Sequence, residues 1–271
     1  MEWPKLKNII LLILVITNLF LLVFVLRREM GLYHAQKEAR SNAVAFLAAR
    51  GVEVDEEIIP RTGHLAPQTV ERDLTAEGAA AAELLGGSVS VEPRGGEVYR
   101  YYNENGAVQF HNDGSFSAEF AAGAFPLGET REAVCEEALA ALGFQGELLE
   151  ETQETLVYRQ TWNGVALFNQ QVTLEYNDGC LTAMTGGRRL MGEPVPVTGE
   201  TTFSEGCALI VFLNELDALG DICSRLDGIT PGYVSVMSLN KVMTLTPVWR
   251  IATDTGTYQL NLVSGGLERL G

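Results

Sequence analysis

One short pattern in the sequence is typical of a catalytic nucleophile. Ser238 and Lys241 have the spacing of the S-x-x-K motif of penicillin-binding proteins, in which a serine attacks a carbonyl carbon. That motif opens a helix, so that both side chains share a face. Here it lies between two predicted strands, and the chain has no S-D-N or K-T-G sequence to complete such a site. We therefore interpret residues 238–241 as a hairpin turn.

Other residues that could carry chemistry do not form a recognisable site. No two histidines have the spacing of a metal-binding helix, and the positions are His34, His64 and His111. Four carboxylates are close enough in sequence for acid–base work, but a solvated acidic face explains them better: Glu147, Glu150, Glu151 and Glu154. Phosphate-binding and dinucleotide-binding glycine motifs are missing from the sequence. We expect no catalytic activity, no cofactor and no metal.

The cysteines are too far apart in sequence for a zinc or thioredoxin-like motif. The chain has four of them, at Cys135, Cys180, Cys207 and Cys223, with no C-x-x-C pair. Disulfides are one interpretation, and buried free thiols are the other.

The charge balance excludes nucleic acid as a partner. The net charge of the chain is −16, and residues 1–30 have two more basic than acidic side chains, so residues 31–271 carry −18. Such a domain repels phosphates. With 46% apolar residues it has enough hydrophobic side chains for one large or two smaller folded domains.

Residues 9–26 are predicted to form a membrane-spanning helix. Nineteen positions, Asn8 to Leu26, contain no charge. They span about 28 Å as a helix, close to the ~30 Å hydrocarbon core of a bilayer. A cleaved signal peptide is less suitable, because its apolar region has about 7–15 residues and ends at small residues, whereas Arg27 and Arg28 follow here. The first cysteine, Cys135, is too distant for a lipoprotein anchor.

Asn18 is the residue of this span that is least favourable in a membrane, because hydrocarbon offers no hydrogen-bond partner for its side-chain amide. Helical spacing puts it on one face with apolar neighbours, and we predict this face as the contact with a partner helix: Leu11, Leu14, Asn18, Leu22 and Val25. There are two alternatives. Asn18 could serve only to dimerise the protein, or it could be tolerated near the middle of the helix without a partner.

The orientation of the span follows from chain length, since the basic residues at its two ends are equal in number. A short head followed by one long domain is typical of a signal anchor. We expect residues 1–8 in the cytoplasm and residues 31–271 outside the cell membrane.

Residues 31–125 are predicted to form an external α+β subdomain. A helix with apolar positions from 32 to 47 ends at Gly51, and a second helix covers 75–85. Strands over 98–102, 107–111 and 115–120 alternate with the turn dipeptides Asn-Gly and Asp-Gly, which indicates a β-meander.

Two later segments, 126–190 and 200–271, are predicted to be diverged copies of one helix-plus-hairpin unit. Each begins with a helix, over 130–142 and 202–216, with a cysteine at the same place. The second copy has an apparent insertion, 221–245, with strand-like alternation. The fold class is therefore α+β with antiparallel sheets.

The start of the chain, Met1-Glu2-Trp3-Pro4-Lys5-Leu6-Lys7 leading into the span, resembles the YycI-like two-component-system regulatory proteins of the YycH/YycI family. The helix-plus-hairpin units resemble the PepSY-like modules of that family, with residues 50–125 matching only in outline. The resemblance implies a single-pass regulator of a cell-wall-sensing, WalK-type histidine kinase in signal transduction, with a YycH-like sister protein as a second partner. An inhibitor or chaperone of a secreted peptidase, which PepSY modules also suggest, is the alternative.

Overall fold

The computed structural model describes residues 14–15, 17–21, 37–60, 65–128, 130–238 and 242–270. Within these ranges, no helix has the length and apolar character needed to cross a lipid bilayer. The cytoplasmic head predicted over 1–8 lies outside the described residues, and the predicted span over 9–26 lies only partly within them. Residues 37–49 form a helix that is followed by Gly51 at φ +83°, which agrees with the predicted helix end.

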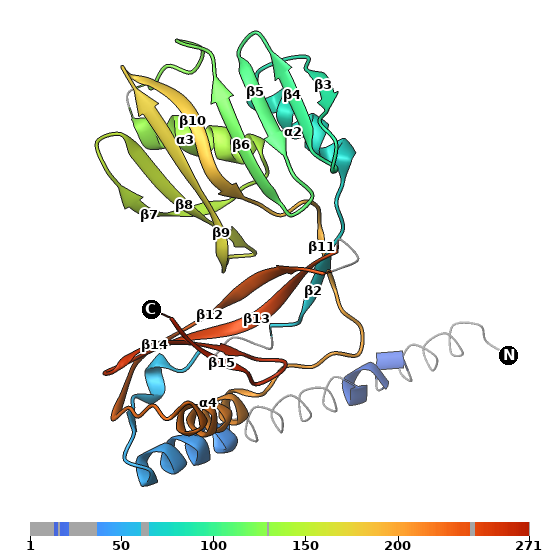
Figure 1. Ribbon diagram of the computed structural model, residues 1–271. Coiled ribbons are helices and arrows are strands. Elements are labelled where there is room, and N and C mark those ends of the chain that lie inside the picture. Colours follow the sequence, from blue (N-terminus) through green and yellow to red (C-terminus); the bar gives the residue numbers. More distant parts are fainter. Residues whose placement is uncertain are drawn as a thin grey trace, which may run out of the picture.

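One order of elements, a helix followed by an antiparallel meander of four strands, occurs three times in the described chain (Figure 1). The first unit comprises α2 (Leu74–Leu84), β3 (Ser90–Pro93), β4 (Tyr99–Asn103), β5 (Gly106–Phe110) and β6 (Ser115–Phe120). The second comprises α3 (Arg131–Ala141), β7 (Gly146–Glu151), β8 (Thr155–Trp162), β9 (Val165–Asn177) and β10 (Cys180–Arg188). The third comprises α4 (Glu205–Leu219), β12 (Arg225–Met237), β13 (Met243–Thr253), β14 (Gly256–Asn261) and β15 (Leu267–Leu270).

This order extends one sequence-based prediction and corrects another. The predicted α+β subdomain over 31–125 contains the first of the three units. The apparent insertion over 221–245 contains β12, which has the same place after its helix as β7 has in the second unit. Strand β7 could not be recognised from the sequence, because it is exposed along its whole length and does not alternate between apolar and polar residues.

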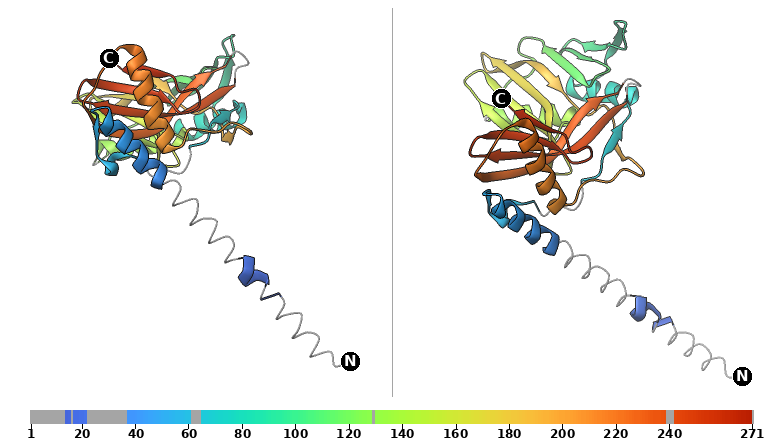
Figure 2. Two further views of the ribbon diagram at one scale, coloured as in Figure 1. Left: turned by 90° about the horizontal axis from the view of Figure 1, so that it is seen from below. Right: turned by 60° about the horizontal axis from the view of Figure 1, so that its bottom comes forward.

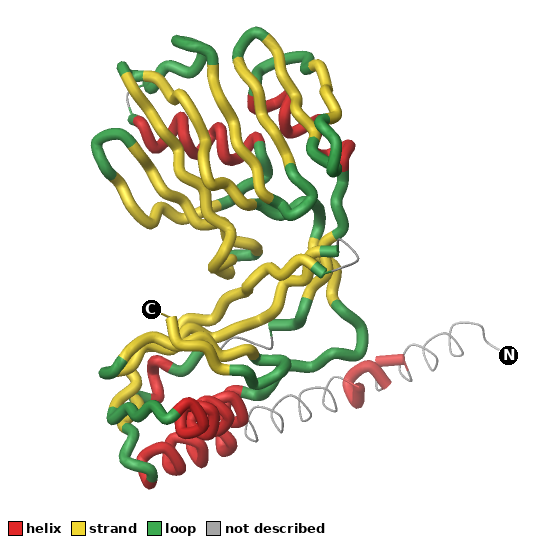
Figure 3. Tube along the Cα trace, viewed as in Figure 1, coloured by secondary structure: helices red, strands yellow, loops and turns green. Residues whose placement is uncertain are grey.

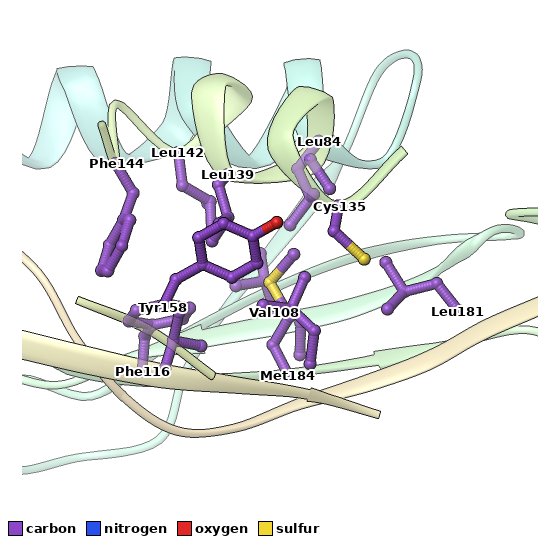
Figure 4. Packing of buried hydrophobic residues seen from close by; sticks show 14 of the residues in the cluster. Leu84, Val108, Phe116, Cys135, Leu139, Leu142, Phe144, Tyr158, Leu181 and Met184 are labelled. Atoms are coloured by element: carbon purple, nitrogen blue, oxygen red, sulfur yellow. The ribbon is translucent and has the colours of Figure 1, made fainter. Parts of the chain in front are cut away.

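The first two units share one antiparallel sheet, in the order β7-β8-β9-β10-β6-β5-β4-β3, because β6 pairs with β10. Helices α2 and α3 cover one face of this sheet, and apolar side chains from both helices and the strands form one core (Figure 4). We call this part the α2/α3 lobe. Two of its tight hairpins, at Asn163-Gly164 and Asp178-Gly179, have positive φ at both turn positions, as type I′ turns require. In the predicted turn dipeptides of the first unit, the glycines Gly106 and Gly114 have positive φ.

The α4 lobe contains the third unit and short segments from earlier in the chain. These are β1 (Glu53–Val54), η1 (Glu56–Ile58), β2 (Gln68–Val70) and β11 (Pro194–Pro196). The helix over 37–49 and α4 pack against each other on one face of the sheet (Figures 1 and 3). A Cβ added at Gly206 of α4 would lie 2.8 Å from the carbonyl oxygen of Ala39, so the two helices approach closely.

The two lobes are joined by a parallel pairing of β9 with β12, in which Ala166 lies opposite Gly232 and Leu167 opposite Tyr233. Gly232 is required there, because an added Cβ would lie 2.4 Å from the Phe168 ring and 2.8 Å from the Ala166 carbonyl oxygen. An α+β fold dominated by antiparallel sheet is thus confirmed, and the parallel pairing is an addition that the sequence did not predict.

Candidate functional site

The described part of the predicted partner-binding helix exposes apolar side chains. Residues 14–15 and 17–21 are helical and lie away from both lobes in every view (Figure 2). Leu14 and Phe20 are 59% and 68% exposed, and Asn18 is also exposed. Leu14 and Asn18 are four residues apart, so they share a helix face. The other residues predicted for that face, Leu11, Leu22 and Val25, lie outside the described residues.

Ser238, the first residue of the S-x-x-K pattern, lies at the end of the β12–β13 hairpin, in agreement with the predicted turn. Ser238 follows β12, and its hydroxyl accepts a hydrogen bond from the backbone N–H of Val242, just before β13. Lys241 lies outside the described residues. Ser238 therefore follows a strand, whereas the serine of the penicillin-binding motif opens a helix.

One of the histidines and two of the four clustered glutamates have side-chain partners in the structure. His111 Nε2 lies 3.0 Å from Gln109 Nε2, and the other two histidines are outside the described ranges. Of the four clustered glutamates, Glu147 pairs with Arg159, and Glu151 pairs with Arg131. Across the described residues, no group of three or more His, Cys, Asp or Glu side chains is placed to hold a metal ion.

All four cysteines are free thiols, so no disulfide forms between them. Burial raises the pKa of the Cys135 thiol to about 11, with Glu132 adding to the effect, and burial likewise raises that of Cys223 to about 11. Cys207 is exposed, which contradicts the interpretation of all four as buried thiols. It lies one helical turn into α4, on the side away from the core.

An ion pair is buried at the start of the first unit. Glu77 of α2 is 1% exposed, and both its carboxylate oxygens accept hydrogen bonds of 2.8 Å from Arg72. Arg72 also donates to the Glu97 carbonyl oxygen at 2.6 Å and lies over the Tyr99 ring. This pair was not predicted, since only the folded chain reveals which of the many acidic residues is buried.

A cavity of about 560 Å³ lies between α2, α3 and the β8–β9 hairpin, and the segment that follows β10 closes one side of it. Arg189 and Gln160 line it, although these polar side chains are 7% and 2% exposed. Gly192 lies in the closing segment, where an added Cβ would meet the Glu71 carbonyl oxygen at 2.2 Å, so this wall packs tightly on the chain before α2.

No protein-family model and no curated protein matches the chain. Among solved structures, it is similar to an uncharacterized protein from Eubacterium rectale ATCC 33656, with 12% identity, a TM-score of 0.39 and coverage of 80% of this chain and 85% of that one. It is also similar to the YpeB C-terminal domain of Bacillus megaterium, with 11% identity, a TM-score of 0.34 and coverage of 74% and 99%. Both likenesses are distant, so the function must be argued from the residues of this chain.

Proposed function

We propose that the protein is a membrane-anchored extracytoplasmic regulator that modulates a cell-wall-sensing, WalK-type histidine kinase by protein–protein contact. It has no catalysis of its own, and a YycH-like sister protein is a second partner in the membrane. The residues after the span form the external part, with the second and third units as PepSY-like modules. One observation carries the proposal: an uncharged stretch of nineteen residues whose described helical part exposes its apolar side chains.

The physical argument is one of differential binding. A partner shifts a kinase between signalling states only when it binds one state better than the other. A coupling of about 1–3 kcal/mol changes the population ratio by about 5- to 150-fold. An interhelical hydrogen bond from an amide in lipid contributes about 0.6–2 kcal/mol, so Asn18 supplies part of this coupling and the apolar face around Leu14 supplies the rest.

The test compares Asn18→Leu with Thr17→Leu, a matched loss of a polar side chain from a neighbouring helix face. Both variants keep the span. We expect Asn18→Leu to weaken co-purification with the kinase from detergent-solubilised membranes and to change expression of the kinase's target genes, while Thr17→Leu leaves both unchanged.

A third variant, in which an unrelated membrane helix replaces residues 9–26, separates the anchor from the external domain. Normal regulation by both this variant and Asn18→Leu would show that the span makes no specific contact. The peptidase inhibitor or chaperone would then be the better interpretation, because such activity needs only the external domain.

A further inference from the structure

The cavity between α2 and α3 contains a buried guanidinium group that no carboxylate neutralises directly. Nη1 of Arg189 donates a hydrogen bond of 2.6 Å to the Leu142 carbonyl oxygen, at the end of α3. Its Nε and Nη2 have no protein acceptor among the described residues. Neither nitrogen is among the fully buried polar atoms that lack a hydrogen-bond partner. Arg189 lines the cavity, so a bound ligand can supply the acceptors that these two nitrogens lack.

The charges around Arg189 leave an excess of positive charge inside the lobe. Glu77 is the acidic group that acts on Arg189, but both its oxygens already bind Arg72. Two guanidinium groups therefore share one carboxylate. A buried cation is costly unless it is paired, so this arrangement favours an anionic group in the cavity.

Gln160 gives the cavity a second fixed polar group. Its Oε1 accepts a hydrogen bond of 3.0 Å from the backbone N–H of Leu190, next to Arg189. The side chain is therefore held in place, and it is 2% exposed. Arg189 is held as well, since its guanidinium lies 4.6 Å from the centroid of the Phe110 ring. Both groups are rigid before a ligand arrives, which lowers the entropic cost of binding.

Acidic residues line the same cavity. They are Asp73, Glu83 and Glu193. Asp73 caps α2 by accepting hydrogen bonds from the N–H groups of Thr75 and Ala76. Glu83 and Glu193 are exposed and have no ion-pair partner within the described ranges. The cavity thus combines a buried cation with an acidic rim, which favours a molecule that carries both charges over a simple anion.

We propose that this cavity binds a short zwitterionic peptide, whose terminal carboxylate pairs with Arg189 and whose cationic side chain lies at Glu83 and Glu193. Ligand pockets in proteins have volumes of about 300–1,000 Å³, so a cavity of about 560 Å³ is large enough for a few residues. Small residues such as Ala79 and Ala140 form part of the wall, which leaves room for the peptide backbone.

The experiment uses the full-length protein in detergent micelles and the tripeptide Ala-Ala-Lys, with affinity measured by isothermal titration calorimetry. Two comparison probes isolate the charges: Ala-Ala-Lys amide lacks the carboxylate, and acetyl-Ala-Ala-Ala lacks the cations. We expect each comparison probe to bind at least about tenfold more weakly, as the loss of a charge-assisted hydrogen bond predicts.

Arg189→Gln should reduce the affinity for Ala-Ala-Lys at least about tenfold. Arg188→Gln is the matched control, since that residue is exposed and pairs with Asp113 at 3.4 Å, and it should bind normally. Ala140→Met fills the cavity from an exposed position of α3 and leaves Arg189 in place, so it keeps the test valid if Arg189→Gln unfolds. It should also abolish binding.

Failure of the wild-type protein to bind Ala-Ala-Lys at millimolar concentration would overturn the proposal, as would normal binding by Ala140→Met. Equal affinity for the peptide and its amide would refute the role of Arg189. The experiment requires neither the kinase nor the membrane contact, so its outcome is independent of the test of the regulatory function.

Discussion

Arg159 and Arg250 lie over the same aromatic ring, that of Phe168, although they belong to different units of the fold. Their guanidinium carbons are 5.3 Å and 4.0 Å from the ring centroid. Each follows a buried aromatic residue, Tyr158 or Trp249, in the second strand of its unit. Burial lowers the pKa of Arg250, and the charge of Arg159 adds to this effect. Equivalent positions of two units therefore meet where the lobes join.

The joint between the lobes should be sensitive to one methyl group. Gly232→Ala should lower the free energy of unfolding by about 1–3 kcal/mol, because the new Cβ overlaps the Phe168 ring. Gly228→Ala, in the same strand, has nothing within 4 Å of its added Cβ and is the control. Urea denaturation measures both. Equal stability of the two variants would show that the β9–β12 pairing accommodates the added methyl group without loss of unfolding free energy.

The buried ion pair between Arg72 and Glu77 should contribute far more to the stability of the fold than exposed ion pairs do. Glu77→Ala leaves Arg72 buried without its carboxylate, and we expect a loss of about 3–5 kcal/mol in the free energy of unfolding. Glu92→Ala removes an exposed pair with Arg94 and should change stability by less than about 1 kcal/mol. A loss at Glu77 no larger than that at Glu92 would contradict the assigned burial.

Much of this arrangement follows from local sequence. The β4–β5 and β5–β6 hairpins and the helices α3 and α4 agree with the patterns that predicted them. The parallel β9–β12 pairing was missed because the paired residues are far apart in the chain and carry no local signal. The cavity was missed for the same reason, since Arg189 meets Leu142 only in the folded chain.

The thiols should differ in reactivity according to their exposure. At pH 8 in the folded protein, Cys207 should react with a maleimide reagent, because it is exposed. Cys135 lies in the core near Tyr158 and has a raised pKa, so it should react only after unfolding (Figure 4). Mass spectrometry of the labelled peptides identifies the site. Rapid labelling of Cys135 without denaturant would be inconsistent with this core.

The raised pKa of Cys135 also predicts a pH dependence of stability. The thiol ionises near pH 9 in the unfolded chain and at about pH 11 in the folded one. The folded state therefore binds the proton more tightly. The stabilisation is complete below about pH 9 and is lost as the pH rises to about 11. Chemical denaturation across this window should show a smaller decline for Cys135→Ala than for the wild type, and identical slopes would disprove the linkage.

The proposed topology can be tested with the native Cys207. If residues 31–271 are external, a membrane-impermeant maleimide should label Cys207 in intact protoplasts, and Cys207→Ser should remove most of this label, because Cys207 is the most exposed of the four thiols. Labelling that occurs only after the cells are lysed would place the domain on the cytoplasmic side.

The α4 lobe is built from both ends of the described folded chain, with the α2/α3 lobe inserted between them. The helix over 37–49 packs on α4, and Glu53 of β1 lies opposite Arg225 of β12 in a parallel strand pairing. These contacts therefore close a very long loop. Such contacts form slowly and only after the last segments are available. During synthesis the α2/α3 lobe is complete first, and the helix over 37–49 lacks most of its apolar partners until α4 and the strands after it emerge. A protein stalled or cut before α4 therefore exposes that helix, which makes the incomplete chain a natural target for proteases and chaperones.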